Sequence, residues 1–122
     1  AGLRNAEGTG LSNTLEEMFQ DVTIAENLFT GNTTLGIIVT NAKLNKTQLT
    51  KVAGMTHNGF ARAIRPVHTN ADGDSIYALS TGGQAGDVNV VGSMAAWAME
   101  RAIVRAVRAA QPACGLPGCG VL

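Results

Sequence analysis

The feature that most constrains the fold is an uncharged run, TTLGIIVT, at positions 33–40. It is rich in β-branched residues, which favour strands. Alternate side chains of a strand point to opposite faces, and neither face of this run carries a charge. The two faces hold, in turn, Leu35, Ile37 and Val39, and Gly36, Ile38 and Thr40. A strand without a polar face is typical of a covered sheet, so we expect this one to be buried on both sides.

The length and composition indicate a part of a larger assembly. At 122 residues the chain forms at most one domain, which is small for a self-sufficient enzyme. Charged residues make up 15% of it, against roughly 25% in a typical soluble domain. The 15 glycines suit a backbone that comes close to other backbone. A surface with so few charges is typical of one that is covered, so we expect other parts of an assembly to pack on it.

Charge and cysteine usage exclude several classes of function. The formal net charge is zero and the pI is about 7.0, so no general field attracts nucleic acid or an anionic membrane. No apolar run approaches the roughly 18 residues of a membrane span, and the opening AGLRNAEGTG lacks the regions of a secretory signal. We expect Cys114 and Cys119 to be free thiols rather than a zinc site or a disulfide. These features predict a cytoplasmic protein without a metal or cofactor.

A helix is predicted between Asn45 and Pro66. Asn45 and Gln48 have the spacing of a capping box, and apolar residues then recur at helical intervals to about residue 64. Pro66 ends the helix. Gly54 and Gly59 inside it indicate either a weaker helix or close packing against another element.

The remaining elements complete a β-α-β-α order after a helical leader. The leader is a short helix that begins near Asn13 or Thr14. A second strand is expected at 75–80, followed by a flexible stretch, TGGQAGD. A long helix then runs from about 88 to 110, with Asp87 as its cap. This alternation predicts an α/β fold.

The residues before the first strand, Gly31-Asn32-Thr33-Thr34, admit two interpretations. The simpler is an ordinary turn, because glycine and asparagine favour turns. The other is a bond that the protein cuts in itself. A threonine freed at an N-terminus carries an α-amine with an ordinary pKa of ~7.7 to 8, which can act as base for its own hydroxyl. Attack of that hydroxyl on the preceding carbonyl gives an ester, which water then opens.

The turn Asp72-Gly73-Asp74 presents two carboxylates directly before the second strand. Such a pair can orient an amine, accept a proton or bind a cation. The alternative is a solvated Asx turn. A calcium-binding EF-hand is excluded, because Ser75 and Thr81 occupy the positions where that loop requires glycine and glutamate.

Neither histidine is predicted to act as a general base. No G-x-S-x-G nucleophile elbow occurs, so nothing indicates a serine–histidine–aspartate triad of that type. His68, in the loop before the aspartates, is expected to organise that loop or to line the site. His57 is expected to be a packing or surface residue of the helix.

These motifs are specific in combination. They are the Asn32-Thr33 junction, the apolar strand, the helix end ARAIRPVHT, and the Asp72-Gly73-Asp74 turn before a strand that ends in Ser-Thr-Gly. Over about residues 28–110, the chain resembles the β-subunit region of the DmpA-type N-terminal-nucleophile peptidases. Within that family it is most similar to the nylon-oligomer hydrolase branch.

The resemblance implies a set of site residues. The family's precursor cuts itself at the bond that corresponds to Asn32-Thr33. Thr33 then becomes both the new N-terminus and the nucleophile that attacks an amide. Asp72 and Asp74 would sit beside it and support its amine and hydroxyl. The β-aminopeptidase branch carries serine and glutamate at these two positions, so the aspartate pair favours the nylon-oligomer branch.

The resemblance also implies a fold and partners. Family members form layered α-β-β-α sandwiches, of which the order found here is half. Residues 1–32 would be the C-terminal end of the α-subunit region with the processing loop, and 33–122 the β-subunit region. The larger α-subunit portion of the same precursor contributes a lysine and an oxyanion-stabilising asparagine, so this chain alone should be catalytically poor. Processed heterodimers are expected to form a homo-oligomer.

The predicted function is that of a self-processing amide hydrolase that acts on short linear amides or peptides with an amino end. Two alternatives remain open. One is a non-enzymatic binding or assembly module of the same fold. The other is an acyltransferase, since a related threonine-nucleophile family transfers acetyl groups.

Overall fold

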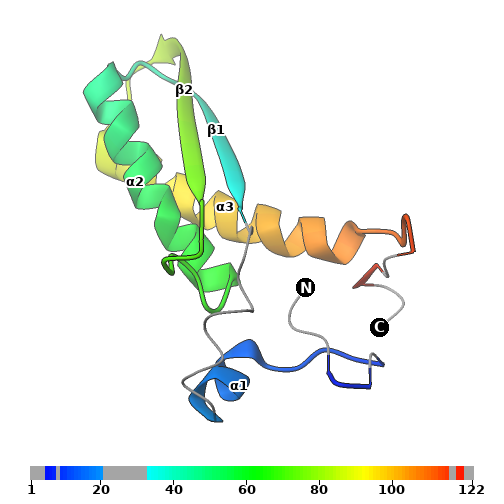
Figure 1. Ribbon diagram of the computed structural model, residues 1–122. Coiled ribbons are helices and arrows are strands. Elements are labelled where there is room, and N and C mark those ends of the chain that lie inside the picture. Colours follow the sequence, from blue (N-terminus) through cyan, green and yellow to red (C-terminus); the bar gives the residue numbers. More distant parts are fainter. Residues whose placement is uncertain (1–4, 8, 21–32, 116–117, 120–122) are drawn as a thin grey trace.

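The computed structural model describes residues 5–7, 9–20, 33–115 and 118–119. The elements along these residues are α1 (Thr14–Gln20), β1 (Leu35–Ala42), α2 (Lys46–Ala63), β2 (Ser75–Gln84) and α3 (Val88–Ala109) (Figure 1). The predicted α/β class and the β-α-β-α order after a helical leader are therefore confirmed. The predicted helix boundaries agree with the structure to within about one residue.

β1 and β2 pair in parallel from their first residues, with Leu35 opposite Ser75. A parallel pair needs a crossover connection, which α2 supplies. β2 continues to Gln84, so the predicted end at residue 80 was wrong and TGGQ is strand rather than flexible loop. The far end of β1 accounts for this extension, because the Lys43 N–H donates to the Gln84 carbonyl at 2.7 Å.

Side chains cap both long helices as the sequence predicted. At α2, the Asn45 side chain accepts the N–H of Gln48, and the Gln48 side chain accepts the N–H of Asn45, each at 2.9 Å. This reciprocal pair is a capping box. At α3, the Asp87 carboxylate accepts the N–H groups of Asn89 and Val90. Each helix therefore begins at a defined residue.

The core lies between the two long helices and one face of the sheet. α2 contacts β2, α3 contacts β1, and the helices pack on each other (Figure 1). Val52, Thr56 and Phe60 of α2 are fully buried. The buried Thr56 hydroxyl donates to the Val52 carbonyl at 2.8 Å, so it is not left without a partner. The opposing residues of α3 are Ala95, Ala96 and Met99.

The other face of the sheet is uncovered, and the expectation that β1 is buried on both sides was wrong for this chain. Five large apolar side chains on that face are between 56% and 69% exposed. They are Leu35, Ile37, Val39, Tyr77 and Leu79. Both long helices contact the strands from the opposite side, so the described residues provide one helix layer and one sheet layer. The full α-β-β-α sandwich remains a prediction.

Two further findings concern the thiols and the helices. Cys114 and Cys119 are free thiols, as predicted, and both are exposed. Among the described residues, no helix combines the length and the apolar character that crossing a membrane requires.

Two glycines of α2 provide a matched test of the helix packing. A Cβ placed on Gly59 would meet the Ala96 carbonyl and lie 2.9 Å from the Met99 Cβ, whereas one on Gly54 meets nothing within 4 Å. We expect Gly59→Ala to lower the free energy of unfolding by about 1 to 3 kcal/mol, as overpacking does. Urea unfolding of the full-length protein measures this.

Gly54→Ala is the control for the change in helix propensity. Alanine is favoured over glycine in a helix by about 0.8 to 1 kcal/mol, so this variant should be as stable as the original or more stable. Equal effects of the two substitutions would contradict the close approach of α2 to α3 at Gly59.

Candidate active site

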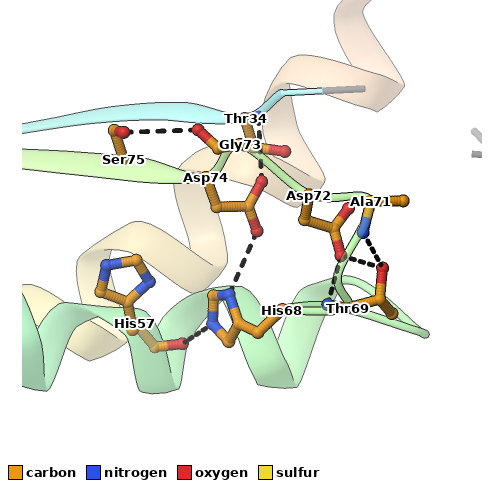
Figure 2. A network of polar contacts seen from close by, with 9 residues as sticks. All are labelled: Thr34, His57, His68, Thr69, Ala71, Asp72, Gly73, Asp74 and Ser75. Atoms are coloured by element: carbon orange, nitrogen blue, oxygen red, sulfur yellow. Dashed lines mark hydrogen bonds and ion pairs between the residues drawn. The ribbon is translucent and has the colours of Figure 1, made fainter. Parts of the chain in front are cut away.

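The candidate site forms where β1 and β2 begin. Because the strands are parallel and paired from their first residues, the segments that precede them meet at one edge of the sheet. One segment is Thr33-Thr34, and the other is the end of the loop from α2, which includes Asp72 and Asp74. Figure 2 shows Asp74 between Thr34 and His68.

Asp74 binds the start of β1 directly. Its Oδ1 accepts the N–H of Thr34 at 3.0 Å, and the N–H of the following Ser75 donates to the Thr34 carbonyl at 3.0 Å. The Asp74 side chain is only 5% exposed. These two bonds hold both the N–H and the carbonyl of Thr34 to the segment that begins β2.

The second oxygen of Asp74 lacks a hydrogen bond. His68 Nδ1 lies 3.2 Å from Oδ2, which is within ion-pair distance. The alignment is too poor for a hydrogen bond, and no donor among the described residues satisfies Oδ2. A buried carboxylate oxygen without a donor is costly, so this atom is a favourable place for an additional N–H or O–H group.

Gly73 lies against the Thr33 hydroxyl. A Cβ placed on Gly73 would lie 2.7 Å from the Thr33 Oγ1, which is closer than a real side chain can approach. Glycine is therefore the residue that leaves room for the Thr33 side chain here. The turn thus contributes a carboxylate on Asp74 and a gap at Gly73.

The two carboxylates diverge. The Oδ2 of Asp72 accepts the N–H of Thr69 at 2.6 Å and the Thr69 hydroxyl at 2.8 Å (Figure 2). The Asp72 N–H donates back to the Thr69 carbonyl at 3.1 Å. Asp72 therefore closes the turn through one of its oxygens, while Asp74 faces the start of β1. Neither carboxylate forms the Asx turn that the sequence allowed, in which the side chain accepts the N–H two residues further on. Asp72 accepts from Thr69, three residues earlier, and Asp74 accepts from Thr34.

His68 lies between the site and the helix layer. Its ring is stacked on Phe60, with centroids 6.0 Å apart, and meets the His57 ring edge-on at 4.8 Å. Its backbone has a φ of 58°, in the left-handed region. The predicted roles of both histidines are in keeping with this arrangement, since His57 packs on Phe60 at 5.5 Å and His68 lines the site.

The environment of His57 lowers the pKa of its ring. Burial makes the larger contribution, and the charge of His68 lowers the pKa further, while Asp74 acts in the opposite direction. His57 is therefore neutral near pH 7, and it is suited to packing rather than to carrying charge.

The structure brings together Thr33, Asp72 and Asp74 at one edge of the sheet, as the sequence suggested, but their catalytic roles stay predictions. Asn32 and the bond before Thr33 lie outside the described residues. Sequence reasoning missed two features. One is the contact of Gly73 with Thr33, which the position of a glycine between two aspartates could have indicated. The other is the contact of His68 with Asp74, which no local sequence pattern indicates.

The chain has relatives among known proteins. Residues 4–119 match peptidase family S58. An uncharacterized aminopeptidase of Mycobacterium tuberculosis (strain ATCC 25618 / H37Rv) is 39% identical over 101 residues, which are 70% of this chain and 29% of that protein. A 6-aminohexanoate-oligomer endohydrolase of Paenarthrobacter ureafaciens is 41% identical over 51 residues, which are 42% of this chain and 14% of that enzyme. The chain spans less than a third of the length of these relatives.

The histidine pair generates a test of the site's electrostatics. We expect the His57 ring to titrate below its ordinary pKa of 6.5. In His68→Asn the pKa of His57 should rise, because the charge of His68 is removed, but burial should still hold it below 6.5. Ring-proton NMR against pH measures both values. A His57 titration at or above 6.5 in the original protein would contradict the packing described.

The same shift predicts how stability depends on pH. With the folded-state pKa of His57 lowered, the unfolded chain takes up this proton at a higher pH than the folded protein does. The contribution of His57 to the free energy of unfolding is therefore fully present above pH 6.5. It is lost as the pH falls from 6.5 through the folded-state pKa. Urea unfolding midpoints should fall over that window, and less steeply in His57→Gln.

Proposed function

The chain belongs to peptidase family S58, and we propose that it carries the nucleophile of a self-processing amide hydrolase. The observation that carries this proposal is the position of the Thr33 hydroxyl against Gly73, beside a buried aspartate that binds Thr34. The names of its relatives, an aminopeptidase and a 6-aminohexanoate-oligomer endohydrolase, support hydrolysis of an amide bond.

The first step is cleavage of the chain between Asn32 and Thr33. The Thr33 Oγ attacks the carbonyl carbon of Asn32, the C–N bond breaks, and the nitrogen takes up a proton to become the amine of Thr33. The ester that joins Asn32 to Thr33 is then opened by water, which leaves a carboxylate on Asn32 and a free hydroxyl on Thr33. Contacts at Thr34 and Gly73 hold the reacting residue in place during both steps.

The second step is turnover of substrate by the freed Thr33. Its amine accepts the hydroxyl proton while Oγ attacks the amide carbon of the substrate. The leaving nitrogen departs protonated as an amine, and water hydrolyses the acyl ester on Oγ. The threonine hydroxyl is restored, and the products are a carboxylate and an amine.

Asp74 is the group that orients the freed amine. Its Oδ1 already accepts the N–H of Thr34, the residue next to that amine, and its buried Oδ2 has no aligned donor among the described residues. An ammonium or amine N–H on Thr33 supplies such a donor. Asp72 contributes indirectly, because its bonds to Thr69 shape the turn that carries Gly73 and Asp74.

The chain needs a partner to complete the site. The larger portion of the same precursor would supply the oxyanion donors, each worth about 2.7 to 4 kcal/mol of transition-state stabilisation. The uncovered apolar face of the sheet provides a surface for that portion. We propose that residues 1–32 end the α-subunit region, that 33–122 form the β-subunit region, and that processed heterodimers associate in the cytoplasm. The substrates are short linear amides with an amino end, such as ω-amino acid oligomers.

Replacement of the nucleophile tests the proposal. In the full-length precursor, Thr33→Ala should leave one uncut chain, because no hydroxyl remains to attack the Asn32 carbonyl. Thr34→Ala is the matched control, since it keeps the backbone N–H that binds Asp74. Intact-mass measurement after incubation separates the two. Cleavage that persists in Thr33→Ala would refute the assignment.

The glycine contact gives a second test. Gly73→Ala should slow self-cleavage at least tenfold, because its Cβ would displace the Thr33 hydroxyl. Gly83→Ala, later in β2, is the control, since a Cβ there would lie 3.9 Å from its nearest neighbour. The rate of cleavage is followed by mass spectrometry. If the two variants cleave at the same rate, the Thr33 hydroxyl does not react from the position described.

A further inference from the structure

We propose that His68 is a positioning residue that acts on the reaction through Asp74. This inference rests on the proposed function, since it concerns how the aspartate beside Thr33 is held. It assigns a role to a side chain that does not itself touch the reacting atoms. The role is to orient the Asp74 carboxylate through the His68 ring.

The Asp74 carboxylate is shared between two neighbours. Its side chain is nearly excluded from solvent, and the Thr34 N–H donates to its Oδ1. The ring nitrogen nearest to Oδ2 is His68 Nδ1 at 3.2 Å. Because a carboxylate oxygen can only accept, this contact is favourable when Nδ1 carries a hydrogen. The imperfect alignment leaves lone pairs of Oδ2 free for a second donor, which the freed amine of Thr33 would supply.

Two neighbouring rings of α2 hold the His68 ring. Phe60, on which the ring stacks, is fully buried in the helix layer, and the His57 ring meets the His68 ring edge-on. His68 Nε2 lies 3.5 Å from the His57 carbonyl oxygen. The position of Asp74 is thereby linked to the core through α2, so the carboxylate that faces Thr33 rests on a rigid element.

The backbone of His68 is in the left-handed region. A φ of 58° is uncommon for residues other than glycine, although histidine adopts it more often than most. Asparagine and glycine adopt this region more easily than most residues. The left-handed backbone directs the histidine ring back toward both α2 and Asp74 (Figure 2).

The test uses variants that suit this backbone and differ in the side chain. His68→Asn keeps an N–H donor near Asp74. His68→Asp introduces a side chain of the same shape as asparagine but places a second carboxylate there. Self-cleavage of the full-length precursor at the bond before Thr33 is timed by mass spectrometry. We expect a rate about threefold lower for His68→Asn and about a hundredfold lower for His68→Asp, the size of loss that a misplacement of about 1 Å produces.

His68→Gly tests whether the ring orients Asp74 or whether only the backbone of His68 matters, by shaping the loop. Glycine suits the left-handed backbone but removes the ring, so this variant should fold and cleave slowly. Added imidazole should raise its rate at least tenfold, because His68 is 35% exposed and its vacated space opens to solvent. Asn70→Ala, on the exposed part of the same loop, should cleave at the original rate. Urea unfolding checks that all variants are folded.

The outcomes distinguish this inference from the proposed function. Cleavage of Thr33→Ala, or an original chain that is never cut, overturns the proposed function. If the original is cut and Thr33→Ala is not, equal rates for His68→Asp and His68→Asn overturn the role of His68 alone. Failure of imidazole to accelerate folded His68→Gly overturns it as well.

Discussion

The candidate site depends on the parallel pairing of β1 and β2 from their first residues. This pairing brings Thr34 to Asp74 across 40 positions of sequence. It also places Gly73 against the Thr33 hydroxyl. A shift of one residue in the register would turn every side chain of a strand to its opposite face, so the pairing must be held firmly. The capped α2 crossover and its close packing on α3 at Gly59 provide that constraint.

Much of the fold could be predicted because its signals are local. The capping box of Asn45 and Gln48 and the cap at Asp87 are recognisable from spacing alone. Apolar residues at helical intervals predicted α2, and Val52, Thr56 and Phe60 form its fully buried stripe. What local patterns could not supply was tertiary context. β2 extends past residue 80 because the far end of β1 binds it, and nothing within TGGQ itself indicates a strand.

The meeting of the two segments at this edge of the sheet was predictable, but the geometry of their side chains was not. The sequence places two aspartates in one turn, yet their side chains separate, because Thr69 takes Asp72 and Thr34 takes Asp74. The contact of His68 with Asp74 depends on a left-handed backbone and on Phe60, neither of which a motif reveals. The prediction that β1 is buried on both sides failed for the same reason, because it also depends on tertiary context. The apolar composition of a strand indicates that both faces are covered, but it does not tell which part of a protein covers them.

The proposed chemistry requires that Thr33 becomes a free N-terminus beside Asp74. N-terminal sequencing of the purified full-length protein tests this most directly. We expect two termini, one of which reads Thr-Thr-Leu-Gly and begins at Thr33. A single N-terminus, with one polypeptide continuous through Asn32 and Thr33 in a protein that hydrolyses amides, would contradict it.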